Sequence, residues 1–187
     1  MKKIPTIFLR DHETHNLTAP NPLCDWVFRG EGRATRKYDG TQVMVDHIGA
    51  IWKRYEVKPG KESPAGFLEV DHDEVTGKIV GWLPIDSGPE DKYIREAIMN
   101  WQSYGEAAGK PPEGTYEACG PKIQGNPEHF DKHILVPHGK TELHVEHVSL
   151  FYLRHYLGAI DVEGIVWWHA DGRMAKVKGK DFGIKRV

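Results

Sequence analysis

Glycine and proline set the main constraint on how this chain folds, because they interrupt it at short intervals. The 187 residues include 20 glycines and 12 prolines, which are spread along the sequence and not gathered in one low-complexity tract. Such residues mark turns and the ends of helices and strands. Between them, apolar and polar residues alternate over short stretches, which is the pattern of half-buried strands. The sequence therefore predicts a fold in which short antiparallel strands dominate.

Strand patterns recur along most of the chain. The pattern of residues 33–51 predicts two strands around a turn at 46–49. Near the C-terminus, the segments that begin at Glu163 and Met174 are expected to form two strands that pair through a turn at 170–172. Residues 1–30 and the polar stretch before residue 79 are expected to be irregular. The remaining expected strands span residues 52–58, 79–84, 114–119, 134–136 and 143–148.

One amphipathic helix is expected at residues 91–107. Its apolar residues fall three or four positions apart and would line one face, which we expect to pack on the core. A shorter helix is expected at 150–157. The predicted fold class is α+β, with antiparallel sheets flanked by helices. The apolar residues of the longer helix are Ile94, Ala97, Ile98, Trp101 and Tyr104.

Composition fits one globular domain with limited basic surface. Hydrophobic residues make up 39% of the chain, enough for one sizeable core, so we expect a single domain over residues 1–187. A net charge of -2 and a pI near 6.6 exclude a protein coated in positive charge. Any contact with nucleic acid must then use a local patch. The segment from Arg173 to the C-terminus offers one, with six cations against the single acid Asp181.

The sequence shows no targeting or membrane segment. Its first residues lack an apolar stretch long enough for a signal peptide, and no window approaches the length of a membrane span. The two cysteines, Cys24 and Cys119, lack the spacing of a metal site and are expected to be reduced. We therefore expect a cytoplasmic protein that does not bind membranes.

The segment Lys37-Tyr38-Asp39-Gly40 carries the strongest indication of chemistry. A lysine with its ordinary pKa of about 10.4 is protonated at neutral pH, so it becomes a nucleophile only where burial or neighbouring cations lower that pKa. Arg36 and the half-buried strand that follows Gly40 could supply both conditions. Taken alone, however, the segment is also typical of an ordinary strand end and turn.

Three later segments make a resemblance specific. They are Tyr116 to Pro121, Glu163 to Val166 and Met174 to Phe182. Together with Lys37-Tyr38-Asp39-Gly40, and in this order, they resemble the motifs of the covalent nucleotidyltransferases, which include RNA ligases, DNA ligases and RNA-capping guanylyltransferases. Because Glu117 to Gln124 looks like the third motif of the RNA ligase branch, the chain is most similar to small stand-alone ATP-dependent RNA ligases. The resemblance implies a single adenylation domain with an ATP-grasp-like arrangement of antiparallel sheets.

The resemblance implies that Lys37 is the catalytic residue. Its amine would attack the α-phosphorus of ATP and form a lysyl-AMP intermediate. Lys176 and Lys178 would contact the α-phosphate, and their charges would also lower the pKa of Lys37. They lie two positions apart in an alternating segment, so in a strand they point to the same side.

Carboxylates would take the other roles in ATP binding. By resemblance, Glu163 would bind a divalent metal, Mg²⁺ or Mn²⁺, and Glu117 would bind the ribose hydroxyls. Asp39 would orient the Lys37 loop, with a simple turn role as the alternative. Arg54 is placed where ligases have an arginine that contacts the nucleotide or the RNA end, although Lys53 competes for this assignment.

The chain departs from the ligase pattern in two respects. RNA ligases stack an aromatic ring on adenine from a strand after their third motif, but here the candidate strand is the aliphatic Ile134-Leu135-Val136, flanked by His133 and His138. Only five residues follow Phe182, so we expect no C-terminal OB-fold or other appended domain.

These observations predict an ATP-dependent RNA ligase. It would transfer AMP from Lys37 to an RNA 5′-phosphate, after which a 3′-hydroxyl attacks and seals the strand. The alternatives are a GTP-using RNA-capping guanylyltransferase, a DNA ligase, which would normally carry an additional domain, and a catalytically silent nucleic-acid-binding module. The expected partner is RNA with 5′-phosphate and 3′-hydroxyl ends, and a separate RNA-binding or repair protein could replace the missing domain. We expect a monomer.

Overall fold

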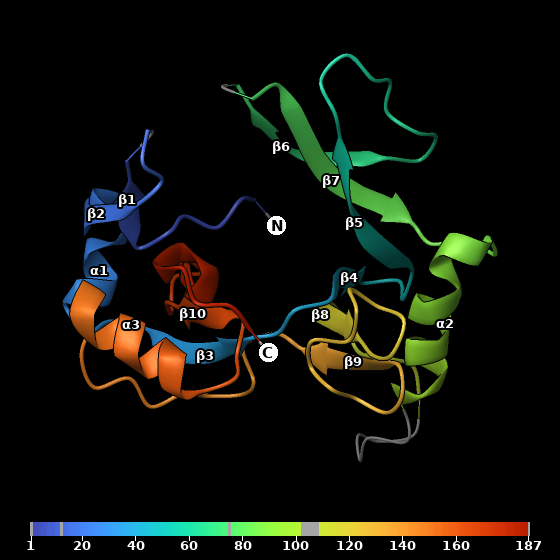
Figure 1. Ribbon diagram of the computed structural model, residues 1–187. Coiled ribbons are helices and arrows are strands. Elements are labelled where there is room, and N and C mark those ends of the chain that lie inside the picture. The colour runs from blue at the N-terminus through green and yellow to red at the C-terminus, as the bar shows by residue number, and fades with distance from the viewer. Residues whose placement is uncertain (1, 12, 75, 102–108, 187) are drawn as a thin grey trace. The chain divides into compact units, whose positions relative to one another are not determined.

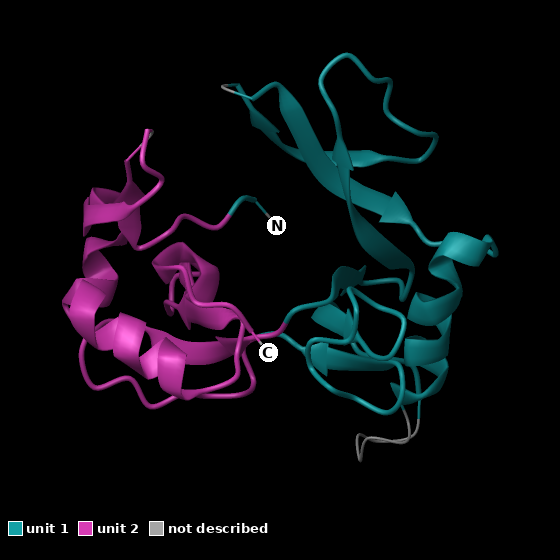
Figure 2. Cartoon of the chain, viewed as in Figure 1, with its two compact units in different colours: residues 1–3, 39–138 teal, residues 4–38, 139–187 magenta. Residues whose placement is uncertain are grey.

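The computed structural model describes residues 2–11, 13–74, 76–101 and 109–186. The chain forms two compact units, which Figure 2 distinguishes by colour. Unit 1 comprises Met1–Lys3 and Asp39–His138, and unit 2 comprises Ile4–Tyr38 and Gly139–Val187. The boundary between Tyr38 and Asp39 falls inside the lysine-bearing tetrapeptide. That both units act as one adenylation domain stays a prediction.

Unit 1 is built on a six-stranded antiparallel sheet. Its strand order is β6-β7-β5-β4-β8-β9, and α2 (Lys92–Met99) lies against β8 and β9 (Figure 1). A short 3-10 helix, η2 (Pro89–Asp91), leads into α2. The strands are β4 (Thr41–Val45), β5 (Ile51–Val57), β6 (Leu68–Asp73), β7 (Lys78–Pro84), β8 (Gly114–Cys119) and β9 (Ile134–Pro137).

Alternation along β4 and β8 fixes which face of this sheet is buried. Val43, Val45, Tyr116 and Ala118 all point to the side of α2, where they join one apolar cluster with residues of that helix. The residues between them therefore point to the opposite face. Glu117 is one of these, and it is paired in register with Gln42 of β4.

Unit 2 contains a three-stranded sheet in the order β11-β10-β3 and a separate two-stranded sheet. All of its strand pairs are antiparallel. Two 3-10 helices, η1 (Pro22–Cys24) and η4 (Gly179–Phe182), complete the unit with two α-helices. The other elements are β1 (Phe8–Arg10), β2 (Leu17–Pro20), α1 (Asp25–Phe28), β3 (Arg33–Lys37), α3 (Leu150–Ala159), β10 (Gly164–Trp168) and β11 (Met174–Lys178).

The core of unit 2 lies on one face of the three-stranded sheet. Ile165 and Trp167 of β10 and Val177 of β11 share an apolar cluster with Leu153 and Leu157 of α3. Ser149 caps α3, because its Oγ accepts a hydrogen bond from the Tyr152 backbone N–H at 3.2 Å. The other face of the sheet thus carries the residues that alternate with the core positions.

The observed elements confirm the α+β class and most of the expected strands. The strands expected at 79–84, 114–119 and 134–136, the helix at 150–157 and the C-terminal strand pair are all present within one or two residues. The longer helix ends at Met99, and residues 102–107 of the expected helix lie outside the described residues. None of the helices in the described ranges is long and apolar enough to cross a membrane.

Three expectations for the strands were wrong. Residues 143–148 form no strand. Next to β3, the backbone makes an isolated bridge at Glu142 and a bond from the Leu143 N–H to the Ala34 carbonyl, and the ladder does not continue along the segment. Residues 1–30 are not irregular, because they contain β1, β2 and α1. The polar stretch before residue 79 contains β6, an edge strand of the larger sheet.

Candidate active site

Three strands of unit 2 place the predicted nucleophile beside one of the predicted phosphate ligands. Gly164 of β10 is directly opposite Lys37 of β3 on one side and Lys178 of β11 on the other. A Cβ atom at position 164 would lie 2.1 Å from the Val177 carbonyl oxygen, so only glycine allows β11 to approach this closely. Both lysines lie on the face opposite the apolar core, because Ala34 of β3 and Val177 of β11, an odd number of positions away from them, pack in that core.

The Glu163 carboxylate joins these two lysines. Its Oε2 lies 2.5 Å from the Lys37 Nζ, and its Oε1 lies 2.5 Å from the Lys178 Nζ. The side chain of Glu163 is only 11% exposed. Burial alone would raise the pKa of this carboxyl, but the charges of the two lysines and their hydrogen bonds outweigh it, so the pKa of Glu163 is lowered. Glu163 is therefore ionised and paired at neutral pH.

Lys176 adds a third amine on the same side of β11. Burial is the main cause that lowers the pKa of Lys176 to about 8, and the charges of Lys178 and Lys37 lower it further. Its amine makes no hydrogen bond or ion pair with any described residue. The Glu163 carboxylate thus pairs with two of these three amines, while the charge of Lys176 is not paired with it. This local excess of positive charge suits an anionic ligand such as a phosphate group.

Glu117 is fixed in unit 1 by two hydrogen bonds. Its Oε1 accepts the Gly40 backbone N–H at 3.1 Å, and its Oε2 lies 2.9 Å from the His138 Nε2. The other ring nitrogen of His138 lies 3.0 Å from the Thr115 hydroxyl. A Cβ atom at Gly40 would lie 2.1 Å from the Ala118 carbonyl oxygen, so glycine is required there as well. Glu117 is only 7% exposed, and its orientation is set by these neighbours.

Asp39 is anchored next to Gly40 through its backbone. Its N–H donates to the Glu128 Oε1 at 2.9 Å, and Glu128 is itself buried. Sequence reasoning missed both Glu128 and the partnership of His138 with Glu117. Glu128 lies in the loop between β8 and β9, where no periodic pattern marks it. The only available signal for His138 was its position two residues after the strand expected at 134–136.

The structure separates the two candidates on β5. Lys53 points to the α2 side of the sheet, where its Nζ lies 2.6 Å from the Oδ1 of the buried Asp91. Arg54 points to the opposite face, on which Glu117 also lies, and its guanidinium is 5.7 Å from the centre of the Trp82 ring. Burial lowers the pKa of Arg54. Lys53 thus forms a structural ion pair on the α2 side, and Arg54 stays the candidate ligand because it lies on the same face as Glu117.

The predicted site residues consequently form two groups. In unit 2, the sheet brings together Lys37, Glu163, Lys176 and Lys178. In unit 1, Arg54 and Glu117 share one face of the larger sheet, and Asp39 is held beside the Gly40 contact to Glu117. Within the described residues of β9, Val136 is the residue paired in register with Glu117, so the position opposite this carboxylate is aliphatic.

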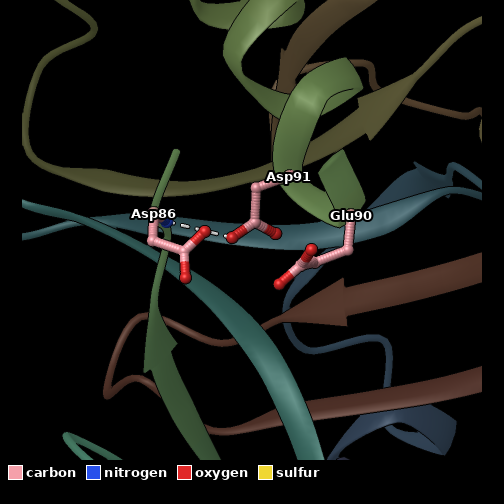
Figure 3. Close-up of side chains that lie close together, drawn as sticks. All are labelled: Asp86, Glu90 and Asp91. Atoms are coloured by element: carbon pink, nitrogen blue, oxygen red, sulfur yellow. Dashed lines mark hydrogen bonds between the residues drawn. The ribbon is translucent and has the colours of Figure 1, made fainter. Parts of the chain in front are cut away.

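An acidic cluster at the start of α2 is the one group of possible metal ligands among the described residues (Figure 3). It consists of Asp86, Glu90 and Asp91. Asp91 already accepts hydrogen bonds from Lys53 at 2.6 Å and from the Asp86 N–H at 3.0 Å. The Arg95 side chain donates to the carbonyl groups of Asp86 and Gly88. These contacts give the cluster a structural role at the entry to the helix.

Comparisons with known proteins point to RNA ligases. No model of a known protein family matches the chain. Over 98% of its length, however, the chain is similar to RNA ligase 1 of Danio rerio, with 23% identity over 264 aligned positions that cover 81% of that protein. RNA ligase 1 of Mus musculus is 21% identical over 98% of the chain and 80% of the relative. These distant similarities support an RNA ligase-like relationship along nearly the whole chain.

Proposed function

We propose that this protein is an ATP-dependent RNA ligase that works through a lysyl-AMP intermediate on Lys37. Two independent findings support the proposal. One is the similarity to RNA ligase 1 over nearly the full chain. The other is the cluster in which Lys37 and Lys178 pair with the carboxylate of Glu163 and the amine of Lys176 interacts electrostatically with all three. The excess of ammonium groups over carboxylates in this cluster is the observation that most directly supports ATP as the ligand.

In the first step, the Lys37 Nζ would attack the α-phosphorus of ATP. A nitrogen–phosphorus bond forms, the bond to the pyrophosphate oxygen breaks, and the ammonium group of Lys37 loses two of its three protons to solvent, so that the phosphoramidate nitrogen keeps one. Lys176 and Lys178 would bind the α-phosphate and stabilise the negative charge that develops during the displacement. Lys176 suits this role because its amine is largely buried and holds no other partner among the described residues.

We propose that Glu163 would also hold a divalent metal when ATP is bound. Mg²⁺ usually binds to one or two protein carboxylates and takes its remaining ligands from phosphates and water, so one carboxylate on this face is sufficient. When bound, Mg²⁺ would offset the charge of the triphosphate. In the structure, Glu163 holds the amines of Lys37 and Lys178 in place through its two oxygens.

Glu117 and Arg54 would bind the nucleotide, as the resemblance implies. An ionised carboxylate has about four acceptor sites, of which Glu117 uses two for Gly40 and His138, so it can also accept hydrogen bonds from ribose hydroxyls. Arg54 would contact a phosphate of the nucleotide or of the RNA end. The hydrogen bonds that fix Glu117 prepare it for this contact without a change in its position.

The two later steps would act on RNA. An oxygen of the RNA 5′-phosphate attacks the phosphorus of lysyl-AMP, and the Lys37 amine leaves. The 3′-hydroxyl of the second RNA end then attacks the adenylated 5′-phosphate, which forms the phosphodiester bond and releases AMP. Positioning and cations supply most of the catalysis in such displacements.

A sealing assay tests this proposal. The protein would be incubated with Mg²⁺, a 5′-phosphorylated RNA and either ATP or GTP, and the products would be separated by length. We expect joined RNA with ATP, none with a 5′-hydroxyl RNA, and none with Lys37→Ala. The control variant Lys61→Ala, in an exposed loop of unit 1, should seal as well as the wild type. Covalent labelling by GTP but not by ATP would instead support a capping guanylyltransferase.

A further inference from the structure

A pocket lined by several cations lies within unit 2, apart from the group formed by Lys37, Glu163, Lys176 and Lys178. Residues of β1, β2, the start of α3 and η4 line it, and its volume is about 620 Å³. Leu17 and Phe182 form part of its apolar lining, and Phe182 packs against Phe8 of the core. Such a pocket can hold a flat group against an apolar wall.

Positive charge exceeds negative charge in this pocket. Arg10 is paired with Asp181, whose side chain is 8% exposed, at a distance of 2.5 Å between Nη2 and Oδ1. Arg154 and Lys180 also line the pocket, are exposed, and form no ion pair within the described part of the chain. Two cations therefore remain available for an anionic ligand. Two separate cations at one pocket suit the successive phosphates of a nucleic-acid strand. Proteins that bind nucleic acid without sequence preference use such contacts between cations and backbone phosphates.

An exposed aromatic ring stands next to these cations. Phe151 is 76% exposed, although it lies in the first turn of α3. It is three residues from Arg154, so both side chains lie on the same side of the helix. The ring of His155 is its neighbour, at 4.2 Å between ring centres. An exposed aromatic ring beside cations is a platform on which an unpaired base can stack.

The pocket is connected to the candidate active site through Asp181. The Oδ2 atom of this residue accepts the backbone N–H of Lys178 at 2.9 Å, while its Oδ1 holds Arg10. The wall of the pocket is therefore continuous with the end of β11, which carries the proposed phosphate ligand. A strand bound in the pocket would lie near the end of β11 that carries Lys178.

We propose that this pocket binds a single-stranded segment of the RNA substrate, with phosphates on Arg154 and Lys180 and a base on Phe151. The inference rests on the proposed ligase function for the identity of the nucleic acid. Stacking on Phe151 requires an unpaired base, so a single strand should bind more tightly than a fully paired duplex of the same sequence.

Binding of a labelled 5′-phosphorylated oligoribonucleotide, followed by fluorescence anisotropy without ATP, tests the inference. Phe151→Ala should weaken binding by roughly 5- to 100-fold, in line with the loss of one stacked base, and Phe151→Trp should retain it. Arg154→Glu combined with Lys180→Glu should reduce the slope of log Kd against log salt by about 1.4, because each phosphate contact to a single strand contributes about 0.7.

Matched controls separate this pocket from general effects of charge and exposed apolar surface. Lys61→Glu removes an exposed cation from unit 1, and Leu23→Ala removes a side chain that is 75% exposed elsewhere in unit 2. Neither should change the affinity for RNA by more than about twofold, since surface substitutions away from a site have small effects. Equal binding of wild type, Phe151→Ala and the double variant would overturn the inference, as would equal affinity for single strand and duplex.

Self-adenylation distinguishes a failure of this inference from a failure of the proposed function. The pocket variants should form lysyl-AMP with ATP as the wild type does, because none of them alters Lys37, Lys176, Lys178 or Glu163. Normal adenylation with unchanged RNA binding would reject the pocket and keep the ligase. RNA binding that depends on Phe151, without any lysyl-AMP in the wild type, would reject the ligase and keep the pocket as an RNA site.

Discussion

Lys176 is the residue whose position most needs explanation. A lysine amine that is largely buried and has no hydrogen-bonding partner among the described residues destabilises the fold in its charged form. The same amine is available to a phosphate without first breaking an ion pair. We interpret the buried amine as a group that lowers the stability of the fold but binds the ligand, as is found at many functional sites.

The first prediction concerns Lys176→Met. The pKa of Lys176 is about 8 in the folded chain against 10.5 as the ordinary value, so the unfolded chain binds more protons between these two pH values. Stability of the wild type should therefore rise as the pH increases through this window. Below pH 8 the variant should be more stable by about 1 to 3 kcal/mol, because it lacks the buried charge.

Chemical denaturation at pH 7 and at pH 10 measures this difference. The advantage of Lys176→Met should be largest at pH 7 and smaller at pH 10, and the variant should lose self-adenylation. A control with Lys61→Met, at an exposed position, should show neither effect. A variant less stable than the wild type at pH 7 would contradict this account of Lys176.

The second prediction concerns Glu163→Gln. The carboxamide cannot neutralise the amines of Lys37 and Lys178, so the variant should be less stable at pH 7 by about 1 to 3 kcal/mol. This value is smaller than that for a fully buried ion pair, because the side chains of the two lysines are 20% exposed. The pKa of Glu163 is lowered in the folded chain, so its contribution is complete above pH 4.5, the ordinary carboxyl pKa, and is lost as the pH falls through the lowered value.

Urea denaturation across the acidic range checks the second prediction. The difference between wild type and Glu163→Gln should shrink as the pH falls below about 4.5. A difference that stays constant down to pH 3 would show that the carboxylate charge is not the cause. Self-adenylation should also fall in the variant, because Lys37 and Lys178 lose the group that positions them.

Sequence reasoning found individual residues of the site better than their partners. Lys37, Glu163, Lys176 and Lys178 were recognised as one motif set, and the register of the strands brings them together. The bond between Glu117 and His138 was not expected, because it depends on the pairing of β8 with β9 and not on spacing along the chain.

At the scale of elements, the close approach of β10 and β11 determines the distance between the amines. The ladder requires glycine at position 164, since a Cβ would lie 2.1 Å from the Val177 carbonyl oxygen. The third prediction is that Gly164→Ala costs about 1 to 3 kcal/mol of stability through overpacking. It should also reduce self-adenylation, because β11 would be pushed away from Lys37.

Gly158→Ala is the matched control for this substitution. Gly158 lies in α3, where the nearest atom to an added Cβ is the Ile184 Cδ1 at 3.9 Å. Alanine there should stabilise the helix by up to about 1 kcal/mol and leave adenylation unchanged. Thermal unfolding and a mass measurement of the adenylated protein compare the two variants. Equal stability of Gly164→Ala and the wild type would disprove the packing argument.

Elements with a clear period were predictable, and those that depend on partners far along the chain were not. The strand at 114–119 was placed without error. The strand β6 was missed because it lies at a sheet edge, where polar residues on both faces hide the alternation. The apolar alternation of Leu143, Val145 and Val148 predicted a strand, but these side chains only pack against the core of unit 2.

At the scale of the whole molecule, positive charge is concentrated at particular sites. The chain is slightly acidic, yet both proposed sites of unit 2 carry an excess of cations. The local excess, and not the net charge, therefore decides which ligands the protein attracts. The composition predicted that any nucleic-acid contact must be local, whereas the pocket lined by Arg154 and Phe151 depends on the fold and could not be located from the sequence.

The ligase account depends most directly on which residue carries AMP. The wild-type protein would be incubated with ATP and Mg²⁺, digested, and its adenylated peptide located by mass spectrometry. We predict one AMP group, on Lys37, and none in Lys37→Ala, while Lys61→Ala is modified as the wild type is. Absence of AMP from the wild type, AMP on another residue such as Lys176 or Lys178, or equal modification of Lys37→Ala would contradict the account.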